Sequence, residues 1–215
     1  MFSTILDLDQ KLTLALNGSD SLVMDHIMLL ITSTMVWIPI GIFLLYYIYN
    51  KCGLKTMLLV LGGILLCILF ADMVSSGVCK PLVARPRPTR EPALAGMIDI
   101  VNGYRGGRYG FFSSHAANTM SVAIFLSLLL RRRSVVLLLI VWSLLNCWSR
   151  IYLGVHYVGD IVVGLAWGTL VGWGIYLAMR RYTGHSLDVN PQPIVAVILL
   201  TFAFIVAAAP FLAAK

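Results

Sequence analysis

Three short segments of this sequence hold most of the side chains that could do chemistry. Together they supply two histidines, one carboxylate, two serines and three cations, namely Lys80, Arg87, Ser113, Ser114, His115, Arg150, His156 and Asp160. The cations would repel a divalent metal ion, so we expect no metal and favour an oxyanion as the guest. Phosphate fits best, because arginine offers forked donors to two oxygens and a helix start offers backbone N–H groups.

Chemistry on a bound phosphate needs a nucleophile and a proton donor, and the two histidines can divide these roles. His156 and Asp160 are spaced i to i+4, which brings them together if a helix begins there. The carboxylate can then accept a proton from one ring nitrogen while the other attacks phosphorus. His115, as a cation, would protonate the leaving oxygen. Residue type and spacing thus suggest phosphoryl transfer.

The other titratable residues lack such partners. We interpret His26 and His185 as structural, and Lys51 with residues 131–133 as cations that extend toward the membrane surface from helix ends. Asp72 is costly inside a membrane, but its place before Lys80 suits pairing with a neighbouring polar group or cation, so it is left out of the site. Four loop cations either line an entrance that attracts anions or are simply solvated, namely Arg85, Arg90, Arg105 and Arg108.

The composition indicates what must position these residues. Of 215 residues, 60% are hydrophobic and 12% are charged, about half the charge of a soluble domain. The high hydrophobic content excludes disorder, which needs low hydrophobicity. Four cysteines without a CxxC pair argue against a disulfide scaffold. The net charge of +7 comes from basic residues in short connections, which argues against nucleic acid as a partner. The sequence therefore predicts an all-α integral membrane protein.

Six apolar stretches are long enough for membrane spans, and they predict a polytopic protein with one membrane-embedded domain, residues 1–215. The stretches are Ile27 to Tyr49, Thr56 to Cys79, Phe111 to Leu130, Ser134 to Ser149, Ile161 to Met179 and Pro191 to Ala214. Six spans place both termini on one face together with the segments that carry the candidate site. Gly164, Gly168 and Gly172 form a small-residue stripe that lets another helix of the bundle approach closely.

The first 23 residues predict an amphipathic helix that lies in the membrane interface. Its apolar residues recur at three- and four-residue spacing, and Asn17-Gly18 ends the pattern. Asp7 and Asp9 stand where a signal peptide would be basic. The alternative is a solvent-facing helix packed on the bundle. The apolar stripe comprises Phe2, Ile5, Leu8, Leu12 and Leu16.

Orientation follows from the basic residues. The first, third and fifth connections carry seven of the 16 Lys and Arg residues and the other face carries nine, so a raw count does not orient the protein. If function holds Lys80, Arg87 and Arg150 on that face, the comparison becomes seven against six, and the odd-numbered connections are far shorter and denser in charge. Because short cytoplasmic loops are enriched in these residues, we expect the odd-numbered loops in the cytoplasm and the candidate site on the opposite face.

The three segments together resemble the three-part signature of the type 2 phosphatidic acid phosphatase superfamily, whose membrane branch comprises lipid phosphate phosphatases. The match consists of Lys80, six residues and Arg87-Pro88, then Ser113-Ser114-His115, then Ser149-Arg150, five residues, His156, three residues and Asp160. With the predicted spans, it covers the chain from about Ile27 to Met179. Phe112 and Ser114 stand where the family usually has Pro and Gly, which changes the local backbone geometry.

The resemblance implies hydrolysis without a metal or cofactor, through a phosphohistidine on His156 assisted by Asp160, with His115 as general acid. It assigns phosphate binding to Lys80, Arg87, Ser113, Ser114 and Arg150. For a bacterial member it implies the inner membrane, with the site facing the periplasm.

The resemblance also implies a membrane lipid phosphate that enters between helices from the bilayer. Undecaprenyl diphosphate and lipid A phosphate are favoured, while phosphatidylglycerol phosphate and phosphatidic acid stay possible; the oligomeric state is left open. The rival hypotheses are an anion or phospholipid transporter and a catalytically silent lipid-binding relative. A site at one membrane face and a His–Asp pair at nucleophile spacing favour the enzyme.

Overall fold

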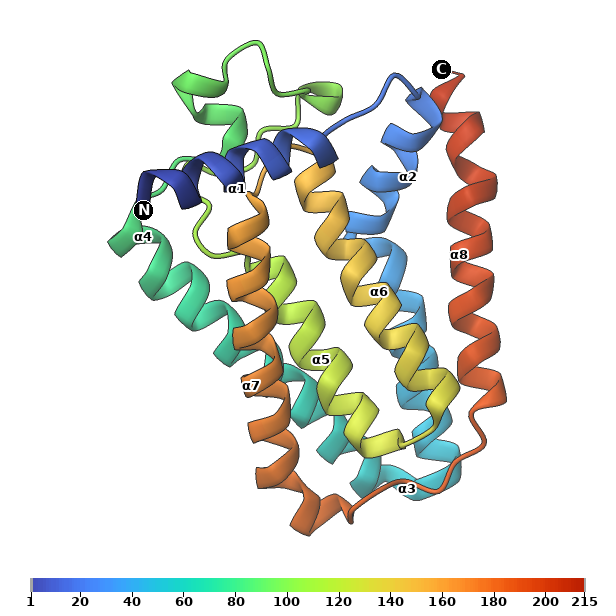
Figure 1. The fold of residues 1–215 in the computed structure, drawn as a ribbon. Coiled ribbons are helices and arrows are strands. Elements are labelled where there is room, and N and C mark those ends of the chain that lie inside the picture. Colours follow the sequence, from blue (N-terminus) through green and yellow to red (C-terminus); the bar gives the residue numbers. More distant parts are fainter. Residues whose placement is uncertain (1, 215) are drawn as a thin grey trace.

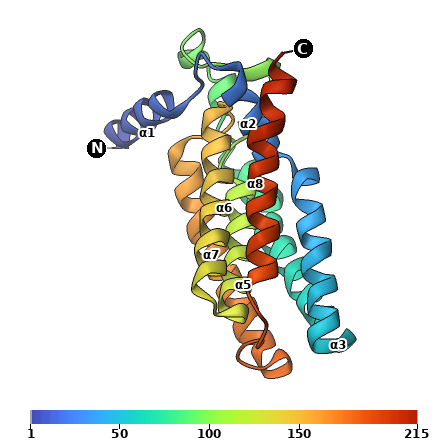
Figure 2. The same ribbon diagram turned by 90° about the vertical axis from the view of Figure 1, so that its right-hand side faces the viewer.

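A computed structural model describes residues 2–214, and helices dominate it (Figure 1). Within that range no strand forms, and an isolated bridge joins Pro86 to Tyr109. Most helices run along one bundle axis, whereas α1 lies across one end and projects sideways from it (Figure 2). The predicted all-α class is confirmed for the described residues.

The long elements are α1 Phe2–Leu16, α2 Leu22–Thr32, α3 Thr34–Asp72, α5 Ser114–Leu130, α6 Arg133–Tyr152, α7 Val158–Thr183 and α8 Gln192–Ala213. Short elements surround the candidate site, namely the π-helix η1 Met73–Cys79, α4 Lys80–Val83 and the 3-10 turns η2 Pro88–Arg90, η3 Pro92–Leu94 and η4 Val101–Gly103.

The first predicted span is wrong as a continuous helix. The stretch Ile27 to Tyr49 is interrupted at Ser33, whose ψ of 116° is extended, so α2 ends and α3 begins there. The indole Nε1 of Trp37 donates to the carbonyl of Ile31 at 2.7 Å, which satisfies a carbonyl that the break leaves without a helical donor. An apolar pattern alone does not reveal such a break.

The helix α3 contains a second break, which turns the chain back along the bundle. Gly53 has φ 82° and ψ 171°, a conformation that glycine adopts without a Cβ clash. The chain then continues through η1 and α4, so Lys80 stands on a helix rather than at the start of a loop as predicted. Ala84 adopts the left-handed conformation and ends this helix.

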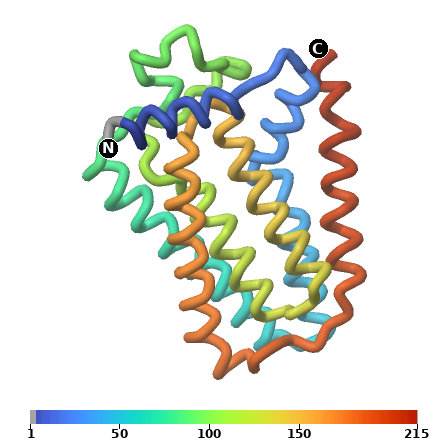
Figure 3. The backbone as a smooth tube through the Cα atoms, viewed as in Figure 1, coloured from blue at the N-terminus to red at the C-terminus, as the bar shows by residue number. Residues whose placement is uncertain are grey.

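The path of the tube in Figure 3 places α1, the end of α8 and the 84–113 loop at one end of the bundle. In the part of the chain that the structure describes, four helical stretches are long and apolar enough to cross a membrane, namely Thr34–Val83, Arg133–Tyr152, Val158–Thr183 and Gln192–Ala213. The helices α2 and α5 are shorter and also apolar. These features describe an integral membrane protein.

The predicted close approach along the glycine stripe is confirmed. A Cβ added at Gly164 would lie 2.7 Å from the carbonyl oxygen of Ser113, and one at Gly168 or Gly172 would also meet backbone of α5. The helices α5 and α7 therefore pack backbone to backbone. Because α5 carries His115 and α7 carries Asp160, this contact sets the spacing between two parts of the candidate site.

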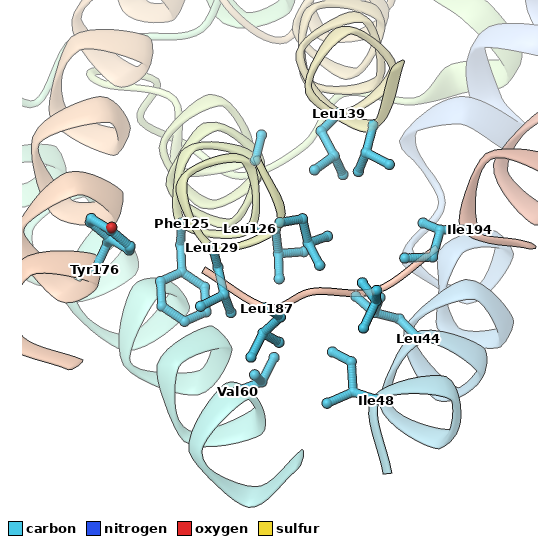
Figure 4. Close-up of a cluster of buried hydrophobic side chains, with 14 of the residues drawn as sticks. Leu44, Ile48, Val60, Phe125, Leu126, Leu129, Leu139, Tyr176, Leu187 and Ile194 are labelled. Atoms are coloured by element: carbon cyan, nitrogen blue, oxygen red, sulfur yellow. The ribbon is translucent and has the colours of Figure 1, made fainter. Parts of the chain in front are cut away.

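The core at the opposite end of the bundle is apolar (Figure 4). Phe125 and Leu129 of α5 are fully buried there, as is Val60 of α3. Leu187, from the segment that joins α7 to α8, reaches the same cluster. Van der Waals packing of these side chains holds α3, α5 and α7 together below the candidate site.

The N-terminal helix α1 is present, and its predicted apolar stripe is exposed. Ile5 is 57% exposed, Leu8 56% and Leu12 44%. The side chain of Phe2, also part of the predicted stripe, lies outside the described residues. The interfacial location of α1 stays a prediction.

Candidate active site

The two residues of the predicted nucleophile pair touch each other. Nδ1 of His156 lies 3.3 Å from Oδ2 of Asp160, and both side chains are buried, with exposures of 1% and 0%. His156 stands just before α7 rather than on it, because Tyr157 is the N-cap. Asp160 closes a capping box by accepting a hydrogen bond from the Tyr157 backbone N–H at 3.1 Å. The helix start thus orients the carboxylate that holds the imidazole.

The imidazole of His156 is kept neutral by its surroundings. Burial, followed by the charges of Arg87 and Arg150, lowers its pKa well below the ordinary value. A neutral ring that donates from Nδ1 to Asp160 has its lone pair on Nε2. That nitrogen lies 3.4 Å from Nη1 of Arg87, and so it faces the cations. A neutral Nε2 directed at a cationic site is suited to attack an anion.

Arg87 is held rigidly above this pair. Its Nε donates to the carbonyl of Tyr109 at 3.1 Å, and its Nη1 donates to the carbonyl of Val155 at 3.2 Å. The side chain is 8% exposed. Gly106 lets the loop pass close by, because a Cβ there would lie 2.8 Å from Nη1 of Arg87. The guanidinium is therefore fixed in direction before any ligand binds.

Lys80 approaches the start of α5 from the other side. Its Nζ donates to the hydroxyl of Ser114 at 2.5 Å and to that of Ser76 at 2.8 Å. Ser76 in turn donates to Oδ1 of Asp72 at 2.9 Å. Asp72 thus satisfies a neighbouring polar group, one of the roles expected from its position. The chain of contacts holds the Lys80 ammonium at the first turn of α5.

The start of α5 supplies hydroxyl and backbone donors. The Ser113 hydroxyl accepts from the Ala116 N–H at 3.4 Å, and the Ser113 backbone N–H donates to the carbonyl of Asp160 at 3.1 Å. First-turn N–H groups have no helical partner and carry the positive end of the helix dipole. His115 is half-buried here and lies close enough to Lys80 and His156 for electrostatic interaction.

Arg150 completes the cationic group from the end of α6. Its side chain is 2% exposed, and it donates to the hydroxyls of Thr32 and of Tyr104, the latter at 3.0 Å. Its Nε is buried without a hydrogen-bond partner among the described residues. A buried, charged N–H of this kind is a ready donor for an oxyanion.

The structure thus brings the three predicted segments together at one end of the bundle. His156 contacts Asp160 and Arg87, Lys80 contacts Ser114, and Ser113 contacts the Asp160 backbone. Among the described residues, Arg150 donates no hydrogen bond to another predicted site residue, and its partners come from α2 and the long loop. Within residues 2–214, no group of three or more His, Cys, Asp and Glu side chains is placed to hold a metal ion.

The loop arginines that the sequence left open have different surroundings. Arg85 donates from Nη1 to Oδ1 of Asp160 at 3.1 Å and therefore reaches the site. Arg90 and Arg105 donate to carbonyls of the loop itself, and Arg108 lies 5.2 Å from the ring of Tyr109. Sequence reasoning missed the contacts of Arg85, and also the hydroxyls of Thr32 and Tyr104 that hold Arg150.

Comparison with known proteins gives matches over most of the chain. The model of the PAP2 superfamily matches residues 57–184. The chain is 37% identical over 194 residues to a lipid A 4'-phosphatase of Bacteroides thetaiotaomicron, covering 90% of this chain and 86% of that protein. It is 36% identical over 198 residues to a lipid A 4'-phosphatase of Porphyromonas gingivalis, covering 89% and 83%.

A solved structure shares the fold. The crystal structure of a transmembrane PAP2 type phosphatidylglycerolphosphate phosphatase from Bacillus subtilis superposes with a TM-score of 0.64 at 20% identity, covering 83% of this chain and 88% of that one. Together, the apolar bundle and these relatives define the class as an integral membrane phosphatase. Within that class, the chain belongs to the PAP2 superfamily.

Proposed function

We propose that the protein removes a phosphate group from a membrane lipid through a phosphohistidine on His156, without a metal or cofactor. The single observation that carries this proposal is the buried pair of His156 and Asp160, with Nε2 of the imidazole 3.4 Å from the Arg87 guanidinium. A nucleophile, its orienting carboxylate and a cation for the reacting group are then in one place.

In the first step, Nε2 of His156 forms a bond to phosphorus while the bond from phosphorus to the lipid oxygen breaks. His115 gives its proton to that leaving oxygen, and a bound phosphate dianion favours the protonated imidazole beside it. In the second step, water attacks phosphorus and the N–P bond breaks. The proton of the water returns to His115, and inorganic phosphate leaves.

Phosphate binding is assigned to cations and donors from the three predicted sequence segments. Arg87 and Arg150 would contact the equatorial oxygens, the buried Nε of Arg150 being one available donor. Lys80, Ser113 and Ser114 would add a charge, hydroxyls and backbone N–H groups at the start of α5. Each of these groups is already held by protein contacts, so little ordering is required when the substrate binds.

The lipid that we favour is lipid A, with its 4'-phosphate as the reacting group. Two relatives at 36% and 37% identity are named for that activity, and the chain covers most of both. Undecaprenyl diphosphate, phosphatidylglycerol phosphate and phosphatidic acid carry the same reacting group and are the competing substrates. The substrate would enter laterally from the bilayer.

In the proposed arrangement, residues 1–215 form one membrane-embedded phosphatase unit that crosses the bilayer six times. One crossing combines α2 with α3 up to Gly53, and the next combines the rest of α3 with η1 and α4. The others are α5, α6, α7 and α8, with α1 in the membrane interface. The site would face the periplasm from the inner membrane, opposite the basic odd-numbered loops.

The test is phosphate release by purified protein in detergent with EDTA present, over a panel of the four lipids. The comparison is between wild type, His156→Ala and His185→Ala, since His185 is exposed and lies in the segment between α7 and α8. We expect release from lipid A by wild type and His185→Ala, and none by His156→Ala. Phosphate release that survives in His156→Ala, or that requires a divalent metal, would contradict the proposal. A folded protein that is inactive on all four lipids would favour a transporter or a catalytically silent relative.

Orientation has its own test in intact cells. In a background with the four native cysteines replaced by serine, Met97→Cys and Lys51→Cys place thiols at exposed positions at opposite ends. A membrane-impermeant maleimide should label the first variant directly and the second only after the inner membrane is permeabilised. The reverse pattern would overturn the proposed orientation.

A further inference from the structure

The helix α1 reaches the candidate active site through an ion-paired bridge. Nη2 of Arg85 lies 2.8 Å from Oδ2 of Asp9 on α1, and Nη1 of the same guanidinium lies 3.1 Å from Oδ1 of Asp160 on α7. A single arginine thus joins a carboxylate near the surface to the buried carboxylate beside His156. Both terminal nitrogens of the guanidinium are already paired with carboxylates, so Arg85 is not a free ligand for phosphate.

The same stretch of α1 also caps the start of α7. Oδ1 of Asp9 accepts from the Gly159 N–H at 2.7 Å, and the hydroxyl of Thr13 accepts from the Val158 N–H at 3.1 Å. These first-turn donors have no partner within α7. A carboxylate at a helix N-terminus also complements the helix dipole. The contact explains why a helix that projects from the bundle is nevertheless fixed at this point (Figure 2).

Close packing restricts how the bridge can move. The guanidinium of Arg85 lies 3.6 Å from the centre of the Tyr157 ring, and a Cβ on Gly159 would lie 3.0 Å from Oδ2 of Asp9. Asp160 is 0% exposed. An uncompensated carboxylate oxygen in such a place is costly, so the Arg85 arm is needed to satisfy it.

The bridge controls which way Asp160 points. Its Oδ1 is bound by Arg85, which leaves Oδ2 for Nδ1 of His156 at 3.3 Å. A partial rotation of the carboxylate would draw Oδ2 away from the imidazole and from the Tyr157 N–H, which donates to the same oxygen at 3.1 Å. With Oδ1 held, that rotation is opposed, and the ring keeps the orientation in which Nε2 faces Arg87.

We infer that Asp9 and Arg85 are positioning residues for the nucleophile, so that α1 is a working part of the active site. This inference rests on the proposed role of His156 as nucleophile. Neither residue touches the reacting atoms; each acts through the carboxylate of Asp160. No spacing in the sequence links them, because Asp9 and Arg85 are 76 positions apart and Arg85 and Asp160 are 75 positions apart.

The experiment measures kcat and KM for lipid A hydrolysis in Asp9→Asn, which removes the charge but keeps an oxygen for the Gly159 N–H. We expect kcat to fall roughly 10-fold with KM within about 2-fold, since small misplacements of reacting groups are costly. Arg85→Gln should lose about 100-fold, and Arg85→Lys should recover part of that loss. The double variant Asp9→Asn/Arg85→Gln should be no slower than Arg85→Gln alone, because both act through one bridge.

Two matched variants on α1 separate positioning from folding. Asp7→Asn removes an equal charge from an exposed position on the same helix and should leave kcat unchanged. Thr13→Val removes the other docking hydrogen bond to α7 without touching Arg85, and it should lower the thermal midpoint while kcat stays within about 2-fold. The thermal midpoint of every variant is measured beside its kinetics.

The outcomes distinguish this inference from the proposed function. If wild type is inactive, or His156→Ala stays active, the proposed function fails. If His156→Ala is inactive but Asp9→Asn matches Asp7→Asn in kcat, only the positioning role is overturned. Equal losses of kcat in Asp9→Asn and Thr13→Val would also overturn it, since docking of α1 alone would then explain the effect.

Discussion

Two arginines of the candidate site differ sharply in burial and in their contacts from an arginine at the opposite end of the bundle. At the site end, Arg87 is 8% exposed and Arg150 is 2% exposed, and each donates hydrogen bonds to at least two other residues. At the opposite end, the side chain of Arg132 is 44% exposed, and its partner Asp188 is 98% exposed. The same residue type is thus rigid and desolvated at one end and solvated at the other.

The difference in burial indicates which cations can act on a reacting group. A buried guanidinium with a fixed direction acts in a low dielectric, where its field on a nearby anion is strong. An exposed one is screened by water and salt, and its ion pair contributes little. Basic residues in a membrane protein therefore fall into two groups: those that stabilise a reacting group and those that lie at the membrane surface. The exposed fraction of the side chain separates the two groups.

The largest expected effect comes from removing one buried cation. Arg87→Gln should lower kcat for lipid hydrolysis by about 100- to 1000-fold, because a preorganised donor to the transition state is lost. Arg132→Gln, at the solvated end, should stay within about 2-fold of wild type. Steady-state kinetics on folded, monodisperse protein measure both. Similar losses of kcat in the two variants would show that burial does not distinguish the arginines at the two ends.

The next effect tests the backbone packing that supports the site. Gly168→Ala places a methyl group against the Ala117 carbonyl of α5, whereas Gly174 on the same helix has nothing within 4 Å of an added Cβ. We expect Gly168→Ala to destabilise the protein by about 2 kcal/mol. Gly174→Ala should show no loss of stability. Denaturation in detergent measures this pair, and equal stability of the two variants would show that close α5–α7 packing is not required.

The buried His156 predicts a loss of stability in acid. Its pKa is lowered well below the ordinary value of 6.5, so the unfolded chain takes up a proton before the folded protein does. Stability from this residue is present above pH 6.5 and is lost progressively as the pH falls below that value. Unfolding at pH 7.5 and 5.5 should show a larger acid loss in wild type than in His156→Gln, which does not titrate. Equal losses would mean that His156 is already protonated in the fold.

The smallest effect is expected at the solvated end. Asp188→Asn removes the ion pair to Arg132, whose atoms are 2.6 Å apart. Because Asp188 is almost fully exposed, we expect activity to be unchanged and any change in the thermal midpoint to be barely detectable. A clear loss of stability in thermal denaturation would show that exposed pairs matter more here than burial suggests.

Much of the site could be predicted from the sequence, because its residues fall in short segments with fixed internal spacing. The spacing of His156 and Asp160 correctly placed them in contact, although His156 lies before α7 and Asp160 is held by a hydrogen bond from the Tyr157 N–H. The glycine stripe of α7 predicted a close helix contact, since small residues at four-residue spacing share one face.

The unpredicted features depend on contacts between distant parts of the chain. The break at Ser33 lies in a continuous apolar stretch and is stabilised by the indole of Trp37, which no hydropathy pattern encodes. The bridge from Asp9 through Arg85 joins residues of α1, the long loop and α7, and neither partner stands in a recognisable motif with the other. Side-chain pairing of this kind follows from tertiary packing, which periodicity does not report.

The most direct test of the central claim is to trap the phosphoenzyme. Wild type, His156→Ala and His185→Ala are mixed with lipid A and quenched within the first turnover at alkaline pH, and phosphopeptides are mapped by mass spectrometry. We expect a phosphate on His156 in wild type and in His185→Ala, and no phosphopeptide in His156→Ala. Rapid turnover by wild type with phosphate on another residue would contradict it.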